Sequence, residues 1–89
     1  MQTEQYLLMC RSLTYAQRSA RLLERAGITA TVTRAPRTVS DQGCGYSVLI
    51  SAKQGKRAME LLSEGELMPR RVLQRTPDGI WREVGYDLS

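Results

Sequence analysis

The sequence lacks histidine and phenylalanine altogether, and its 89 residues include only two cysteines, Cys10 and Cys44. Without histidine the chain cannot form a Ser-His or Cys-His nucleophile pair or a histidine-bearing zinc site. Its apolar runs fall far short of the ~18 residues that a membrane-spanning helix needs. These common forms of catalysis and anchoring are therefore excluded.

Length and composition describe a small soluble protein. A chain of 89 residues predicts a single domain over 1–89. The formal net charge is +4, but the arginines are spread along the chain, so the charge is weak evidence for nucleic-acid binding. The first residues show no basic segment followed by an apolar one, as a signal peptide would. We therefore expect a cytoplasmic protein with reduced cysteines.

Hydrophobic periodicity predicts the order β-α-β-β-α-β. Short apolar or alternating runs predict strands at 5–10, 28–33, 45–50, 71–76 and 80–86. Capping-box patterns at Thr14 and Ser51 should open two helices, which Gly27 and Gly65 should end. The order is that of the ferredoxin-like fold, an α+β sandwich whose sheet contains antiparallel pairs and is backed by two helices. The segment 70–87 is expected to add a C-terminal β-hairpin.

The two cysteines have different surroundings. Cys10 ends an apolar strand on the same side as Tyr6 and Leu8, so we expect it in the core. We expect the strands at 5–10 and 45–50 to run parallel, which would separate the cysteines by roughly 15–20 Å and exclude a disulfide. Cys44 lies in the connection 35–44, which is longer than the usual hairpin loop of about 2–5 residues. Cys44 is therefore the candidate reactive residue.

The residues around Cys44 are of a kind that can activate a thiol. Gly43 and Gly45 flank it, and glycines let backbone N–H groups converge on an anion such as a thiolate. Arg37 would lower the pKa of the thiol, and Ser40 would add a hydrogen bond. The same residues also fit a half-buried structural cysteine in a glycine-rich turn. Both interpretations stay open on the local residues alone.

Several segments, at 6–8, 20–28, 36–40, Cys44-Gly45 and 58–62, resemble a small bacterial and archaeal family described as putative selenium/sulfur carrier-like proteins. The resemblance covers residues 6–64 as a carrier-like core and leaves out the hairpin 70–87. It implies that Cys44 holds sulfur or selenium as a persulfide or selenosulfide. It also implies that a cysteine desulfurase-type donor loads this residue, that a protein acceptor unloads it, and that no cofactor takes part.

Two other functions remain open. A ferredoxin-like interaction or regulatory module without chemistry would use the sheet or the Trp81 hairpin to form a homodimer or to bind a partner. An RNA-recognition-like module would use Tyr6 and Tyr46 to stack on bases, but Val48 stands where a second aromatic belongs. We therefore expect neither nucleic-acid nor membrane partners, and a carrier or interaction module rather than an autonomous enzyme.

Overall fold

The structure, a computed structural model, describes residues 4–34, 45–75 and 78–85 of the chain. The predicted α+β class is confirmed, with two α-helices and a five-stranded sheet in this part of the chain. The elements are, in order, β1 (Gln5–Cys10), α1 (Leu13–Arg25), β2 (Ala30–Arg34), β3 (Tyr46–Ser51), the short 3₁₀ turn η1 (Ala52–Gln54), α2 (Gly55–Glu64), β4 (Arg71–Arg75) and β5 (Trp81–Val84).

The strands are arranged in the order β2-β3-β1-β4-β5, and every neighbouring pair is antiparallel. The prediction that the first and third strands run parallel is therefore wrong. β3 pairs with both β1 and β2, and a strand between two others in an antiparallel sheet opposes both of them. Cys10 is paired with Tyr46, so the end of β1 and the beginning of β3 lie at the same end of the sheet.

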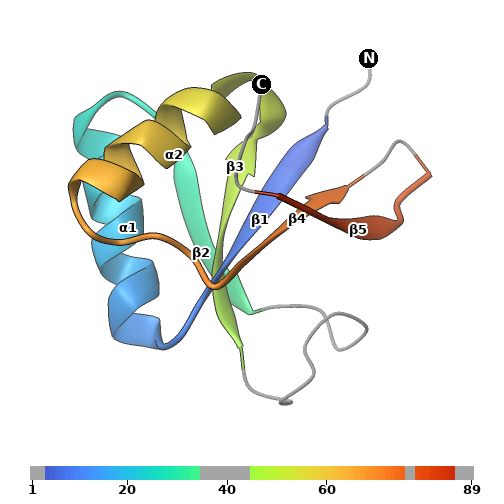
Figure 1. Ribbon diagram of the computed structural model, residues 1–89, viewed down its shortest axis with the longest axis horizontal. Coiled ribbons are helices and arrows are strands. Elements are labelled where there is room, and N and C mark those ends of the chain that lie inside the picture. Colours follow the sequence, from blue (N-terminus) through green and yellow to red (C-terminus); the bar gives the residue numbers. More distant parts are fainter. Residues whose placement is uncertain (1–3, 35–44, 76–77, 86–89) are drawn as a thin grey trace.

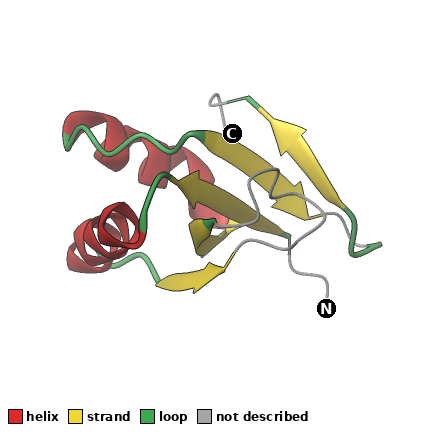
Figure 2. Ribbon diagram, turned by 90° about the horizontal axis from the view of Figure 1, so that it is seen from below, coloured by secondary structure: helices red, strands yellow, loops and turns green. Residues whose placement is uncertain are grey.

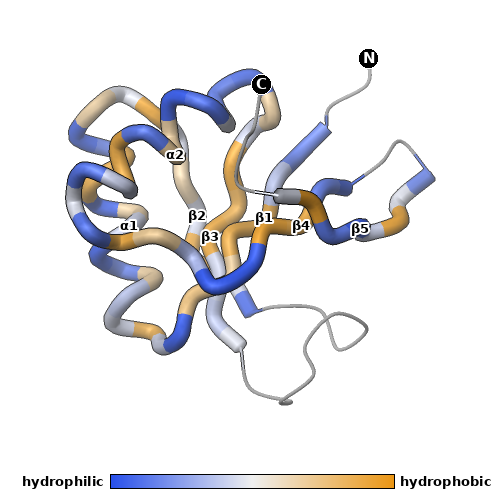
Figure 3. The backbone as a smooth tube through the Cα atoms, viewed as in Figure 1, coloured by the Kyte–Doolittle hydropathy of each residue, from blue (hydrophilic) through white to orange (hydrophobic). Residues whose placement is uncertain are grey.

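One face of the sheet packs against both helices, which lie together on that side (Figures 1 and 2). Strand alternation sends Tyr6, Leu8 and Cys10 of β1 toward the helices, as predicted. Ala16, Ala20 and Leu23 of α1 meet them in the main core. Hydrophobic residues concentrate in the central strands and recur periodically along the helices, which accounts for this packing (Figure 3).

The opposite face carries a second, smaller cluster of buried residues. Leu7 and Met9 of β1 lie there with Leu73 of β4, and Leu49 and Trp81 pack against them. Leu7 and Leu73 are both only 1% exposed. The central strands are therefore buried on both faces, which explains why the apolar run of β1 is continuous rather than alternating.

The cap of the first helix differs from the prediction. The N-cap residue is Ser12 rather than Thr14, and the Ser12 hydroxyl accepts a hydrogen bond from the Tyr15 N–H at 3.3 Å. At the other end, Gly27 follows the helix with φ of 86°, a left-handed conformation that favours glycine. The predicted end of α1 is thus confirmed, while its beginning is earlier in the chain.

The second helix begins later than predicted. Ser51 accepts a hydrogen bond from the Lys53 N–H, but it caps the 3₁₀ turn η1, and α2 begins at Gly55. The helix ends at Glu64, followed by Gly65 as predicted. The left-handed residue after this helix is Glu66, with φ of 58°, rather than Gly65. No helix in the described ranges is long and apolar enough to cross a membrane.

Candidate functional site

The predicted reactive loop leaves the sheet after Arg34 and returns to it at Gly45. Arg34 is the cross-strand partner of Tyr46, which is in turn the partner of Cys10 on the central strand. Gly45, half-buried, leads directly into β3. The other predicted site residues lie outside the described residues: Cys44, Gly43, Arg37 and Ser40. The structure therefore defines the base of the loop, a row of three residues across three strands.

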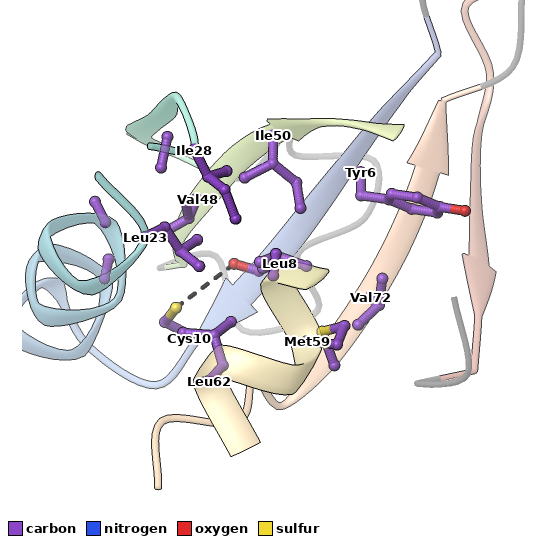
Figure 4. Close-up of a cluster of buried hydrophobic side chains, with 14 residues drawn as sticks. Tyr6, Leu8, Cys10, Leu23, Ile28, Val48, Ile50, Met59, Leu62 and Val72 are labelled. Atoms are coloured by element: carbon purple, nitrogen blue, oxygen red, sulfur yellow. Dashed lines mark hydrogen bonds between the residues drawn. The ribbon is translucent and has the colours of Figure 1, made fainter. Parts of the chain in front are cut away.

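Cys10, the inner member of this row, is a free thiol in the core. It is 9% exposed, and its Sγ donates to the Leu8 carbonyl at 3.5 Å (Figure 4). Burial raises the pKa of Cys10, and a hydrogen bond with the Ser19 side chain opposes this rise only in part. Cys10 is therefore protonated at neutral pH and shielded from reagents, which confirms the prediction of a core residue.

Tyr46, the middle member, joins the core to the surface. Its ring packs against the main core, while its hydroxyl accepts a hydrogen bond from Arg34 Nη2 at 3.5 Å. The Arg34 guanidinium carbon lies 5.5 Å from the ring centroid, within the range of a cation–π contact. Arg34 itself is exposed. A cation is thus held in place at the point where the loop leaves β2.

A second arginine is held in a similar way at the same end of β1. Arg11 directly follows Cys10, and its guanidinium carbon lies 5.0 Å from the centroid of the Tyr15 ring. Positive charge close to a thiol favours the thiolate and lowers the thiol pKa. Sequence reasoning named Arg37 as the cation beside Cys44 and did not single out Arg11 or Arg34, which directly follow or end β1 and β2 at the end of the sheet from which the loop extends. The available signal was that an arginine directly follows each of the first two predicted strands, 5–10 and 28–33.

The same geometry decides against base stacking by the tyrosines. Tyr6 is 7% exposed and packs within the main core, and the half-buried Tyr46 packs against the same core on the face that the helices cover. Neither ring lies on an open sheet surface, where stacking on bases would require it. Among the described residues, no group of three or more acidic or cysteine side chains is placed to hold a metal ion.

Comparison with known families identifies the chain. The sequence model of a family described as putative Se/S carrier protein-like matches residues 5–74. The chain belongs to this family. The match begins at β1, includes the loop with Cys44 and Gly45, and ends within β4, so it contains the complete base of the loop in this Se/S carrier-like protein. Searches among curated proteins and among solved structures find no match.

Proposed function

We propose that this Se/S carrier-like protein holds sulfur or selenium on Cys44, as a persulfide or selenosulfide, and relays it between protein partners in the cytoplasm. Membership of the family supports a carrier. The decisive observation is the burial of Cys10, because the sequence contains only one other cysteine. The strand order and the position of both helices support a ferredoxin-like sandwich as the scaffold for this loop.

Loading is a sulfur exchange that needs no external oxidant or reductant. The Cys44 thiolate attacks the outer sulfur of a persulfide on a cysteine desulfurase-type donor. The donor's S–S bond breaks, its cysteine leaves as a thiolate, and a new S–S bond forms on Cys44. The proton lost by Cys44 balances the proton taken up by the donor thiolate. A selenosulfide donor reacts in the same way and leaves an S–Se bond on Cys44.

Delivery repeats the exchange in the other direction. A nucleophile of the acceptor attacks the outer atom, and the Cys44 thiolate leaves. Both steps need an anionic sulfur at Cys44, and the chain has no histidine to generate it. Arg34 and Arg11 at the base of the loop support such an anion. We assign the remaining stabilisation to Arg37, Ser40 and the backbone N–H groups beside Gly43 and Gly45.

Intact-mass spectrometry of single-cysteine variants tests this function. Wild type, Cys10→Ser and Cys44→Ser are each incubated with a cysteine desulfurase and cysteine, and separately with inorganic polysulfide. We expect one reducible sulfur adduct on wild type and on Cys10→Ser, and none on Cys44→Ser. Equal adduct formation on Cys44→Ser would contradict the proposal, provided that thermal unfolding shows each variant to be folded.

A further inference from the structure

A groove lies between helix α1 and the outer edge of β2. It is open, has a volume of about 430 Å³, and is lined by Gln17, Arg21 and Glu24 of the helix and by Ala30 and Val32 of the strand, among others. β2 is the last strand on this side of the sheet, and no described strand lies beyond it. One wall of the groove is therefore the edge of a β-sheet, and the other is a helix surface.

The register of the neighbouring strands determines where the β2 backbone points. The Ala52 N–H donates to the Glu4 carbonyl at 3.0 Å, which continues the pairing of β1 with β3 by one residue. Hydrogen-bonded and non-hydrogen-bonded pairs alternate along antiparallel strands. Val48 and Ile50 therefore direct their backbone groups toward β1, and the residues between and beside them direct theirs toward β2.

The alternation continues into β2. Leu49 of β3 is paired with Thr31, so the backbone N–H and C=O of Thr31 bond to β3. The residues on either side have the opposite orientation. The N–H and C=O groups of Ala30, Val32 and Arg34 point away from the sheet, along the groove. They form a row of hydrogen-bonding groups with the spacing that an added strand requires.

The common protections of an edge strand are missing from β2. Natural edges are often blocked by proline, lysine or a β-bulge. The sequence of β2 contains neither proline nor lysine, and its register with β3 is continuous over all five residues. Its single charged residue is Arg34 at the end. The edge is thus able to accept a further strand.

We propose that this groove binds an extended acidic segment of a partner protein, which adds to β2 as a sixth strand. Strand addition obtains affinity from main-chain hydrogen bonds and specificity from alternate side chains. Two charged residues line the groove, Arg21 and Glu24, one of each sign. The same helix also carries exposed Arg18 and Arg25, so its charged side chains leave an excess of positive charge beside the groove. Arg34 adds a further cation at the end of the strand, so acidic side chains are favoured over basic ones.

A second copy of the chain is a poorer occupant of the same edge. Antiparallel pairing of β2 with itself about Val32 would bring together two copies of α1, each with three arginines against one glutamate. Two helices of the same net charge repel each other, whereas an acidic segment neutralises that charge. Binding in the groove involves neither cysteine, and Arg34 is the one residue that it shares with the proposed carrier site.

Nuclear magnetic resonance titration of the ¹⁵N-labelled protein tests the groove directly. The probe is an acetylated heptapeptide of alternating valine and glutamate, and the comparison peptide replaces each glutamate by lysine. We expect the glutamate peptide to shift the amide resonances of Ala30, Val32 and Arg34 first, and added salt to weaken it. A third peptide, N-methylated at alternate amides, should not bind. Equal binding of the lysine or the methylated peptide would overturn the proposal.

Two pairs of variants locate the binding surface. Val32→Pro removes an outward N–H that the β2–β3 ladder does not use, and Val32→Ala shortens the side chain but keeps that N–H. Arg21→Glu reverses a charge in the groove, and Arg57→Glu makes the same change on the exposed surface of α2. We expect at least about tenfold weaker binding for Val32→Pro and Arg21→Glu than for their controls.

Three outcomes are informative beyond the expected one. If Arg21→Glu binds the glutamate peptide as well as Arg57→Glu does, the assigned groove is wrong. This test remains valid even if the Val32→Pro variant does not fold. A concentration-dependent dimer in light scattering that Val32→Pro abolishes would assign the edge to a second copy and overturn the proposal. Cys44→Ser should bind the peptide like wild type, which separates a failure of this proposal from a failure of the carrier function.

Discussion

Cys10 and Tyr46 are cross-strand partners on β1 and β3, and they connect the buried core with the base of the loop that contains Cys44. The thiol of Cys10 lies inside the core, while the hydroxyl of Tyr46 reaches the exposed guanidinium of Arg34. The protein thus keeps one cysteine neutral and covered at the end of the sheet from which the segment with its other cysteine extends. The burial of Cys10 and the proposed reactivity of Cys44 are the basis of the first two predictions.

The first prediction concerns the pH dependence of stability. Because burial raises the pKa of Cys10, the folded protein holds this proton more tightly than the unfolded chain. The stabilisation is complete below the unfolded pKa of about 8.5 and is lost as the pH rises through the folded-state pKa. In a Cys44→Ser background, urea unfolding should show that the advantage of Cys10 over Cys10→Ala decreases between pH 7.5 and 10. A stability difference between the two proteins that stays constant over this pH range would contradict the prediction.

The second prediction concerns Arg34. Replacement of Arg34 by glutamine removes a cation from the base of the loop but keeps a side chain that can hydrogen-bond to Tyr46. In a Cys10→Ser background, we expect the midpoint pH of iodoacetamide labelling of Cys44 to rise, because the thiolate loses electrostatic support. Arg57→Gln on the exposed face of α2 is the control and should leave the midpoint unchanged. Equal labelling midpoints in the Arg34→Gln and Arg57→Gln variants would show that Arg34 does not support the Cys44 thiolate.

The third prediction concerns the start of α1. Ser12→Ala removes the side-chain acceptor of the Tyr15 N–H and should lower the free energy of unfolding by about 0.5–2 kcal/mol. Thr14→Ala, two residues later on the exposed side of the helix, removes no cap and should cost less. Urea unfolding of both variants measures the difference. A larger loss of unfolding free energy for Thr14→Ala would show that Thr14, as the sequence alone predicts, is the N-cap residue.

The fourth prediction concerns the face of the sheet away from the helices. Leu73 is 1% exposed and packs with Leu7 and Met9, so Leu73→Ala should destabilise the protein by about 2–5 kcal/mol. Leu13, which is 39% exposed, offers a matched control. Leu13→Ala should change the stability by about 0.5 kcal/mol or less. Similar small losses for both substitutions would show that the second cluster contributes little.

Local patterns predicted the parts of this fold that depend on local interactions. The apolar stripe of α1 and the inward side chains of β1, such as Leu23 and Leu8, follow from helix and strand periodicity. The predicted direction of β3 relative to β1 was wrong, because the pairing of strands is decided by contacts between residues that are distant in the sequence. The burial of Leu7 was not anticipated either, since an apolar residue on the outer face looks the same in sequence whether or not it is covered.

The candidate site was predictable to a similar extent. Gly45 and Cys44 attract attention from sequence alone, because their neighbours and the length of the connection are unusual. Arg34 directly follows a predicted strand, but its contact with Tyr46, twelve residues later, could not be read from that position, because it depends on the pairing of the two strands. The groove beside β2 was missed for the same reason. Which backbone groups face outward is a property of the assembled sheet and of no single segment.

The pairing of β2 with β3 up to Arg34 and Tyr46 has a consequence for the evolution and engineering of the loop that joins these two strands. The sheet already holds Arg34 opposite Tyr46, so the cost of closing the chain between them depends only weakly on its length. Doubling the number of loop residues costs about 0.6 kcal/mol in closure entropy. Residues between Arg34 and Tyr46 can therefore be inserted, deleted or replaced by new reactive side chains while the sheet and both helices stay folded.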